Sequence, residues 1–167
     1  MTEKIFRKYL EIKPHEEFKE VEKPSKDYSV DPAVPKDFQL NKFFYKNIGK
    51  NCHWIDRLVW TDLDWIKYIS DEKLTTHILK DKDEIAGYFE LLYNQNSKVS
   101  EITYFGILEE YFGKKLGGYL LSGAIKYSFT LGSQRVWVHT CSLDHKNALN
   151  NYLSRGMKIF KSETLNR

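Results

Sequence analysis

The sequence contains few residues of the kind that form covalent or metal cross-links. Only two of its 167 residues are cysteines, Cys52 and Cys141, and they are far apart and belong to no CxxC or CxxH motif. This pattern indicates neither a disulfide framework nor a zinc site. We therefore expect a domain that folds around one hydrophobic core, for which this length is sufficient, and a cytoplasmic location.

The sequence also lacks a long apolar run and a large charge excess. No stretch reaches the roughly 18 apolar residues that span a bilayer, and residues 1–13 lack the apolar segment of a signal peptide. The net charge is only +3, and lysines are interspersed with acidic residues, whereas nucleic-acid binding needs a clustered basic face. We expect neither a membrane nor a nucleic acid as a partner. The small excess suits one polyanionic ligand.

Proline is scarce and confined to one segment. All four prolines lie between residues 14 and 35, among many lysines and glutamates. Because proline resists both helix and sheet, residues 14–37 are predicted to form an exposed crossing loop.

Hydrophobic periodicity predicts the remaining elements. In order they are a strand at 6–12, helices at 38–53 and 62–70, strands at 76–80, 85–93 and 99–108, a helix at 113–131, a strand at 134–141, a helix at 144–155 and a strand at 157–162. Thr61 or Asp62 caps the second helix. Gly106 interrupts the fourth strand and marks a bulge or a close backbone approach. This order predicts an α/β fold with a single mixed sheet flanked by helices.

The clearest chemical signal is a glycine-rich turn between a strand and a helix. Residues 112–118 read Phe-Gly-Lys-Lys-Leu-Gly-Gly. Glycine permits close backbone approach, and the unpaired N–H groups of a helix start suit a pyrophosphate. Lys114 and Lys115 add positive charge. A plain helix start explains the turn about as well, whereas the P-loop and dinucleotide motifs do not fit its spacing.

Around this turn the chain resembles the GNAT superfamily of acetyl-CoA-dependent N-acetyltransferases, over about residues 75–162. The cofactor motif of that superfamily, Gln/Arg-x-x-Gly-x-Gly/Ala, falls on residues 112–117. Gly117 matches, while Phe112 and Lys115 depart from the motif. The resemblance implies a mostly antiparallel sheet with splayed central strands.

A second motif of the superfamily, Asn-x-x-Ala-x-x-x-Tyr-x-x-x-Gly-Phe, falls on residues 145–157. Ala148, Tyr152 and Gly156 match it. The asparagine of the motif falls on His145, so either His145 or nearby Asn147 is expected to contact the pantetheine.

The resemblance implies direct transfer of an acetyl group from acetyl-CoA to a primary amine of a small molecule or peptide. An alkyl amine, with a pKa of about 10, arrives protonated and needs a base. Glu101 is the candidate base and Tyr152 the candidate acid for the departing thiolate. An exposed strand glutamate and a core tyrosine are the alternative interpretations of these residues. The alternative function is a non-catalytic acyl-CoA-binding or sensing module on the same fold.

The predicted binding residues fall into two groups. The cofactor is expected to contact Phe105, Gly106, Ile107, Phe112, Gly113, Lys114, Lys115, Leu116, Gly117, Gly118, His145 and Asn147. The acceptor is expected to contact Trp54, Arg57, Trp60 and His139, although burial against the sheet explains the tryptophans equally well. No metal site is expected.

We expect residues 1–167 to form a single GNAT-like domain. Residues 1–37 would hold the first strand and the crossing loop, residues 38–74 the helices on the acceptor side, and residues 75–162 the cofactor-binding core. The assembly is expected to be a monomer or a homodimer.

Overall fold

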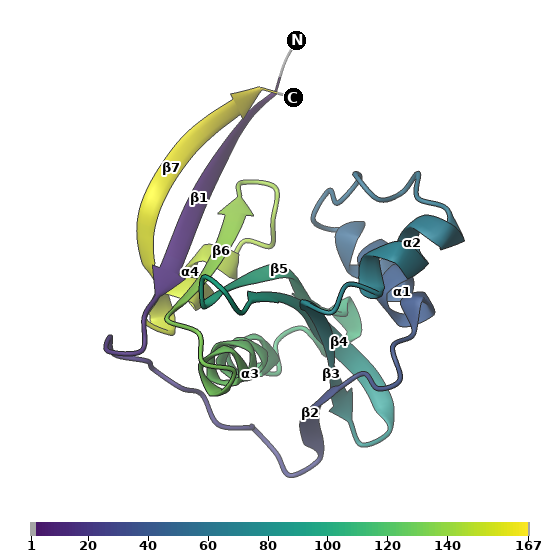
Figure 1. Cartoon of the computed structure of the whole chain (residues 1–167), viewed down its shortest axis with the longest axis horizontal. Coiled ribbons are helices and arrows are strands. Elements are labelled where there is room, and N and C mark those ends of the chain that lie inside the picture. Colours follow the sequence, from purple (N-terminus) through teal and green to yellow (C-terminus); the bar gives the residue numbers. More distant parts are fainter. Residues whose placement is uncertain (1–2, 167) are drawn as a thin grey trace.

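The computed structural model describes residues 3–166. One seven-stranded sheet, in the order β2-β3-β4-β5-β6-β1-β7, forms its centre (Figure 1). The strands are β1 (Lys4–Ile12), β2 (Tyr28–Pro32), β3 (Leu74–Asp81), β4 (Glu84–Asn94), β5 (Val99–Ile107), β6 (Arg135–Cys141) and β7 (Lys158–Asn166). The helices are α1 (Phe38–Gly49), α2 (Asp62–Ile69), α3 (Leu116–Thr130) and α4 (Ala148–Ser154), and η1 (Glu109–Tyr111) is a 3-10 turn. The predicted α/β fold with a mixed, mostly antiparallel sheet is confirmed.

The sheet consists of two antiparallel parts joined by one parallel contact. β5 pairs with β6 only over Val99–Glu101, opposite Arg135–Trp137. Both strands continue beyond this contact, to Ile107 and Cys141, without further pairing. The two central strands therefore splay apart, as the resemblance implied.

The N-terminal strand completes the second part of the sheet. β1 lies between β6 and β7 and pairs antiparallel with both, so the first and last strands lie side by side (Figure 1). Leu10 and Ile12 of β1 are fully buried in the core.

The prediction of a loop over residues 14–37 was wrong in one part. Residues 28–32 form β2, which pairs with β3 from Tyr28↔Asp81 to Pro32↔His77. β2 is an edge strand, where a sheet tolerates proline because one side of the strand needs no ladder hydrogen bonds.

Helix boundaries differ from the predictions where loop geometry intervenes. α2 begins with a capping box in which Thr61 and Asp64 bond each other's backbone, so Thr61 is the cap. α3 begins at Leu116 and not at residue 113, because the 3-10 turn and a left-handed Lys115 precede it. α1 and α4 are also shorter than predicted, ending at Gly49 and beginning at Ala148.

Two sets of helices cover the two faces of the sheet (Figure 1). Leu121 and Ile125 of α3 pack against Phe89 of β4 in the largest core cluster. Phe44 of α1 packs against Tyr88. Tyr88 precedes Phe89 in β4, so its side chain points to the opposite face of the sheet. Among residues 3–166, no helix is long and apolar enough to cross a membrane.

Candidate functional site

A cavity of about 1270 Å³ opens where β5 and β6 diverge. It is lined by residues from β5, β6, the segment between α1 and α2, the start of α3 and α4. The predicted residues that line this cleft are Trp54, Arg57, Glu101, Phe105, Gly106, Ile107, Phe112, Gly113, Lys115, Leu116, Gly117, Gly118, His139, His145, Asn147 and Tyr152. Two further predicted residues do not line it: Lys114 lies over the Tyr111 ring, and Trp60 packs on Arg57.

The cleft exposes the backbone edge of β5. The register between β4 and β5 shifts between Leu91↔Ile102 and Glu90↔Tyr104, so Thr103 is the extra residue of a bulge. Beyond Glu101 no residue of β6 pairs with β5. Polar groups of the backbone on this edge are therefore available to a ligand.

Gly106 was predicted to mark either a bulge or a close backbone approach, and it marks the close approach. The bulge lies at Thr103, and Gly106 pairs regularly with Tyr88. A Cβ atom at Gly106 would lie 2.5 Å from Cγ2 of Ile48. Gly106 is therefore the point at which α1 approaches the sheet closely, and the bulge considered for Gly106 lies instead at Thr103.

The start of α3 leaves its backbone donors free. Lys115 is the N-cap residue, its φ is 62°, and no side chain caps the helix. Gly113 also has a positive φ, of 79°. The N–H groups at the first positions of α3 have no partner within the helix, and the helix dipole makes them a binding site for an anion. Lys115 adopts the left-handed conformation that glycine would supply in the family motif.

Arg155 is a cleft residue that the sequence analysis missed. A Cβ atom at Gly118 would collide with Nη1 of Arg155, so this guanidinium lies directly over the start of α3. Asn151, four residues earlier and on the same side of the α4 segment, places Nδ2 3.4 Å from a Cβ built on Gly117. The second family motif leaves both positions open, so no motif signal identified them.

Glu101 and Tyr152 lie in surroundings that suit acid and base chemistry. Glu101 is half-buried, and this burial raises the pKa of its carboxyl. Within residues 3–166 it has no ion-pair partner. Tyr152 is 6% exposed, and burial raises the pKa of its phenol, so the hydroxyl stays protonated at neutral pH. Its ring lies 6.3 Å from that of Phe105.

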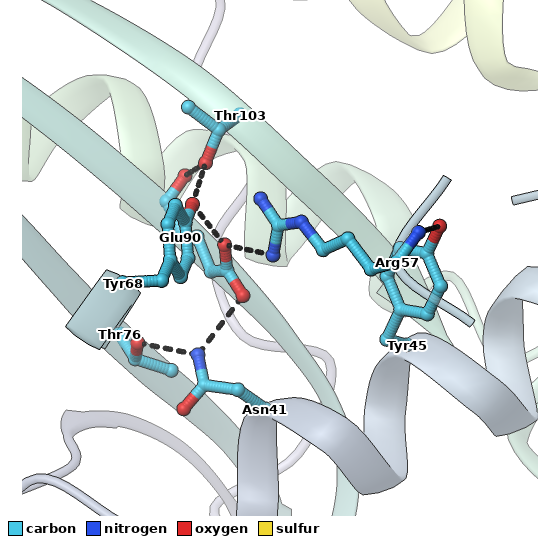
Figure 2. Close-up of polar contacts among 7 residues, drawn as sticks. All are labelled: Asn41, Tyr45, Arg57, Tyr68, Thr76, Glu90 and Thr103. Carbon is cyan, nitrogen blue, oxygen red and sulfur yellow. Dashed lines mark hydrogen bonds and ion pairs between the residues drawn. The ribbon is translucent and has the colours of Figure 1, made fainter. Parts of the chain in front are cut away.

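Arg57 enters a buried polar network that the sequence did not reveal (Figure 2). Its Nη1 lies 3.2 Å from Oε1 of Glu90, which is fully buried. The Tyr68 hydroxyl donates to the same oxygen at 2.6 Å, and Asn41 donates to the other carboxylate oxygen at 2.9 Å. Burial lowers the pKa of Arg57, but the charge of Glu90 and the contacts with Tyr68 and Tyr104 together outweigh it, and the pKa is raised overall.

Aromatic rings surround the same guanidinium. Its Cζ lies 4.0 Å from the ring centroid of Tyr68 and 4.1 Å from that of Tyr104, with Tyr45, Trp60 and Trp65 farther out. Arg57 was predicted to contact the acceptor, which a guanidinium can do by binding a carboxylate or by stacking on a planar group. It makes both contacts within the protein itself, and only 7% of it is exposed.

The network reaches the bulge of β5. The Thr103 hydroxyl donates to the backbone oxygen of Glu90 at 3.2 Å and lies 3.5 Å from the Tyr68 hydroxyl (Figure 2). The network thus links the segment after α1 to the residue at which the β5 edge turns away from regular pairing.

His139 lies on the far wall of the cleft, on β6. Its side chain is exposed and its ring is 5.6 Å from that of Tyr9. Neighbouring residues remove water from the imidazole ring of His139, and this desolvation disfavours its charged form. The positive charge of Arg7 adds to this effect, so the pKa of His139 is lowered. At neutral pH His139 therefore presents a neutral imidazole.

The sheet is thus splayed, its central strand β5 is bulged, and the start of α3 lines the cleft without a side-chain cap. The chain belongs to the acetyltransferase (GNAT) family, whose model matches residues 39–157. No curated protein matches the chain.

Solved structures share this fold at low sequence identity. A GCN5-related N-acetyltransferase from Sphaerobacter thermophilus superposes with a TM-score of 0.74 at 15% identity, over 97% of this chain and 50% of that one. A GCN5-related N-acetyltransferase from Kribbella flavida gives 0.68 at 11% identity, over 96% and 56%. An aminoglycoside acetyltransferase from an uncultured soil metagenomic sample gives 0.63 at 12%, over 80% and 90%. The chain thus spans about half the length of the first two.

Proposed function

We propose that the chain is an N-acetyltransferase that transfers an acetyl group directly from acetyl-CoA to a primary amine of a small molecule or peptide. One observation carries this proposal. A single cleft joins the free backbone donors of α3, the exposed edge of β5, the unpaired carboxylate of Glu101 and the buried phenol of Tyr152. Membership of the GNAT family supports it.

The residues of the cleft fit a long cofactor with a charged and a neutral part. The N–H groups from Gly113 to Gly118 would hold the pyrophosphate, assisted by the positive charge of Lys115. The β5 edge from Phe105 to Ile107 would bind the pantetheine through backbone hydrogen bonds. Acetyl-CoA supplies a thioester, whose acyl carbon is open to attack by an amine.

His145 and Asn147 would contact the pantetheine from the opposite side. The backbone N–H of Asn147 donates to Nδ1 of His145 at 3.1 Å, which leaves Nε2 of His145 to face a ligand. The Phe112 ring lies 4.9 Å from the His145 ring. Phe112 thus provides an apolar contact at the position where the family motif has Gln or Arg.

Glu101 and Tyr152 divide the proton transfers. Glu101 takes a proton from the acceptor ammonium, and the amine nitrogen forms a bond to the acyl carbon. The carbon–sulfur bond breaks, Tyr152 donates its proton to the departing sulfur, and the proton that the nitrogen loses as the amide forms returns to the Tyr152 phenolate. Backbone N–H groups on the β5 edge near Gly106 and Ile107 would stabilise the negative charge that develops on the carbonyl oxygen.

The acceptor would enter between Trp54 and His139, which both line the cleft. Arg57 and Trp60 support this end from beneath, because Glu90 already occupies the guanidinium of Arg57. Of the four residues predicted for the acceptor, Trp54 and His139 would contact it. Arg57 and Trp60 would hold the surrounding structure in place.

A thiol-release assay tests this function. Acetyl-CoA and a broad panel of primary amines are incubated with the chain and with the Glu101→Gln and Tyr152→Phe variants. We expect release with at least one amine, and a decrease of about 10²–10⁴-fold in each variant, the usual contribution of a positioned acid or base. Undiminished turnover in both variants would reject their assigned roles.

The alternative is a non-catalytic acyl-CoA-binding or sensing module. The observation that favours it is the departure from the cofactor motif at Phe112. Binding of acetyl-CoA without thiol release for any amine in the panel would support this alternative and reject catalysis.

A further inference from the structure

Arg155 stands apart from the other arginines that the structure describes. Arg7 pairs with Glu163, Arg57 with Glu90 and Arg135 with Glu11. Within residues 3–166 no carboxylate lies within ion-pair distance of Arg155. Among the described residues its Nε is buried without a hydrogen-bond partner, as is Nε of Arg7, and burial lowers the pKa of the Arg155 guanidinium.

A partly buried guanidinium without an ion-pair partner lowers the stability of the protein unless an anion binds to it. Arg155 lines the cleft, so a ligand can reach it. A guanidinium presents a planar set of donors that matches the oxygens of a phosphate group. The charge and the donors of Arg155 thus call for an anionic ligand and not for an amine.

The position of Arg155 relative to α3 identifies the part of the ligand. Its Nη1 lies over Gly118, at the third position of the helix, where backbone N–H groups are free. A residue with a Cβ atom at position 118 would displace it. Glycine at this position therefore lets the guanidinium of Arg155 lie beside the first turn of α3, where the free N–H groups are.

We propose that Arg155, the C-cap residue of α4, binds the pyrophosphate of coenzyme A, and so supplies the cationic side chain that Phe112 cannot supply from the cofactor motif. This inference rests on the proposed use of acetyl-CoA. Asn151, which lies beside Gly117 on the same side of the α4 segment, would add a neutral amide donor next to it. Phosphate recognition would then involve two helices and not one loop.

Calorimetric titration with a series of truncated ligands tests the proposal. Coenzyme A, dephospho-coenzyme A, which lacks the 3′-phosphate, and pantetheine, which lacks all phosphates, are titrated into the chain and into Arg155→Leu. We expect the variant to bind the first two about 10- to 100-fold more weakly, the effect of one charge-assisted hydrogen-bonding group, and to bind pantetheine unchanged. Arg135→Leu, which removes an arginine outside the cleft, is the matched control and should bind all three normally.

The outcomes are distinct. If the unmodified chain binds coenzyme A and Arg155→Leu binds it equally well, the proposal fails while the function stands. If only coenzyme A is weakened and dephospho-coenzyme A is not, Arg155 contacts the 3′-phosphate and the pyrophosphate assignment is wrong. If the unmodified chain binds none of the three, the proposed function itself fails.

A second variant keeps the proposal testable if Arg155→Leu does not fold. Gly118→Ala places a better helix former in α3 and displaces the guanidinium. We expect Gly118→Ala to bind coenzyme A and dephospho-coenzyme A more weakly and pantetheine unchanged, because it moves the guanidinium away from the phosphate without altering Arg155 itself. Unchanged binding of coenzyme A by a folded Gly118→Ala would show that the guanidinium over Gly118 does not contact the ligand and would overturn the proposal.

Discussion

At the scale of single residues, Glu101 combines a catalytic position with an unfavourable charge. Burial raises the pKa of its carboxyl above the ordinary value of 4.5. As a base it must be ionised, so kcat/KM should fall as the pH decreases through that raised pKa. A pH profile measured with saturating acetyl-CoA checks this expectation. A profile that is flat on its acidic side would exclude Glu101 as the base.

The same pKa shift predicts the stability of Glu101→Gln. A carboxyl whose pKa is higher in the folded state binds protons more tightly when folded, so its stabilising contribution is present at low pH and is lost as the pH rises through the folded pKa. At neutral pH the buried carboxylate of Glu101 therefore lowers the stability of the folded state. Glu101→Gln should melt at a slightly higher temperature than the unmodified chain at pH 7, while its activity decreases by about 10²–10⁴-fold. A lower melting temperature would contradict the assigned surroundings.

A variant at Lys115 tests whether the lysine at this position, where the cofactor motif has glycine, lowers the stability of the fold. The left-handed backbone of Lys115 costs about 1–2 kcal/mol because the residue has a Cβ atom, and glycine would avoid this cost. Glycine would also make the unfolded chain more flexible, which offsets about 0.5–1 kcal/mol of that improvement. Lys115→Gly should therefore raise the free energy of unfolding by up to about 1 kcal/mol in denaturant titrations. Lys98, also left-handed with a φ of 56°, lies in a turn outside the cleft and provides the control. Lys98→Gly should stabilise equally, but only Lys115→Gly should weaken coenzyme A binding.

Residues tied to a short motif could be predicted, and residues defined by distant neighbours could not. The turn at 112–118 carries its chemistry in consecutive positions, so its glycines were identified. Arg155 gains its meaning from facing Gly118, and Glu90 from facing Arg57 across the sheet. Nothing in a linear sequence shows that a strand glutamate and a loop arginine will neutralise each other.

At the scale of elements, the contact between α1 and β5 depends on Gly106. Gly106→Ala would place a Cβ atom 2.5 Å from Cγ2 of Ile48 and force the two elements apart. We expect a loss of about 1–3 kcal/mol in the free energy of unfolding, typical of overpacking. Ile48→Ala should recover part of this loss in the double variant because it removes Cγ2. Ile48→Val retains Cγ2 and should not. Equal behaviour of the two double variants would refute the proposed clash.

The buried pair between Arg57 and Glu90 joins the segment after α1 to the sheet. Arg57→Met or Glu90→Gln alone leaves one buried charge uncompensated and should cost about 3–5 kcal/mol. The double variant removes both charges and should be more stable than either single variant, which a thermodynamic cycle measures. Arg7 and Glu163, a partly exposed pair, should show a coupling below about 1 kcal/mol. A similar coupling in both pairs would contradict the role of burial.

Element types were largely predictable, whereas boundaries and sheet positions were less so. Residues 85–93 are a mostly apolar run that follows a polar turn, and they form β4, because such a run is a local signal of a buried strand. Residues 28–32 were predicted to lie in a loop because proline disfavours strands, yet β2 forms at the sheet edge, where Pro32 is tolerated. The place of a strand within a sheet is a tertiary property that local propensity does not encode.

At the scale of the whole molecule, the order of the strands creates the site. β5 and β6 are separated in sequence by α3, and their short parallel contact holds them together at one end only. β1 pairs with residues more than a hundred positions away in β6, which no local pattern announces. Only the family resemblance allowed the splayed strands, and hence the cleft, to be expected before the fold was known.

The central claim is that this cleft binds acetyl-CoA, and thermal unfolding with added acetyl-CoA tests it most directly. At a ligand concentration of about 100 times Kd, binding to the folded state should add about 2.7 kcal/mol and raise the melting temperature by about 5–10 °C. Free adenosine, which lacks both the pyrophosphate and the pantetheine, serves as the control and should have little effect. An unchanged melting temperature at millimolar acetyl-CoA would contradict both the proposed acetyltransferase and the binding-module alternative.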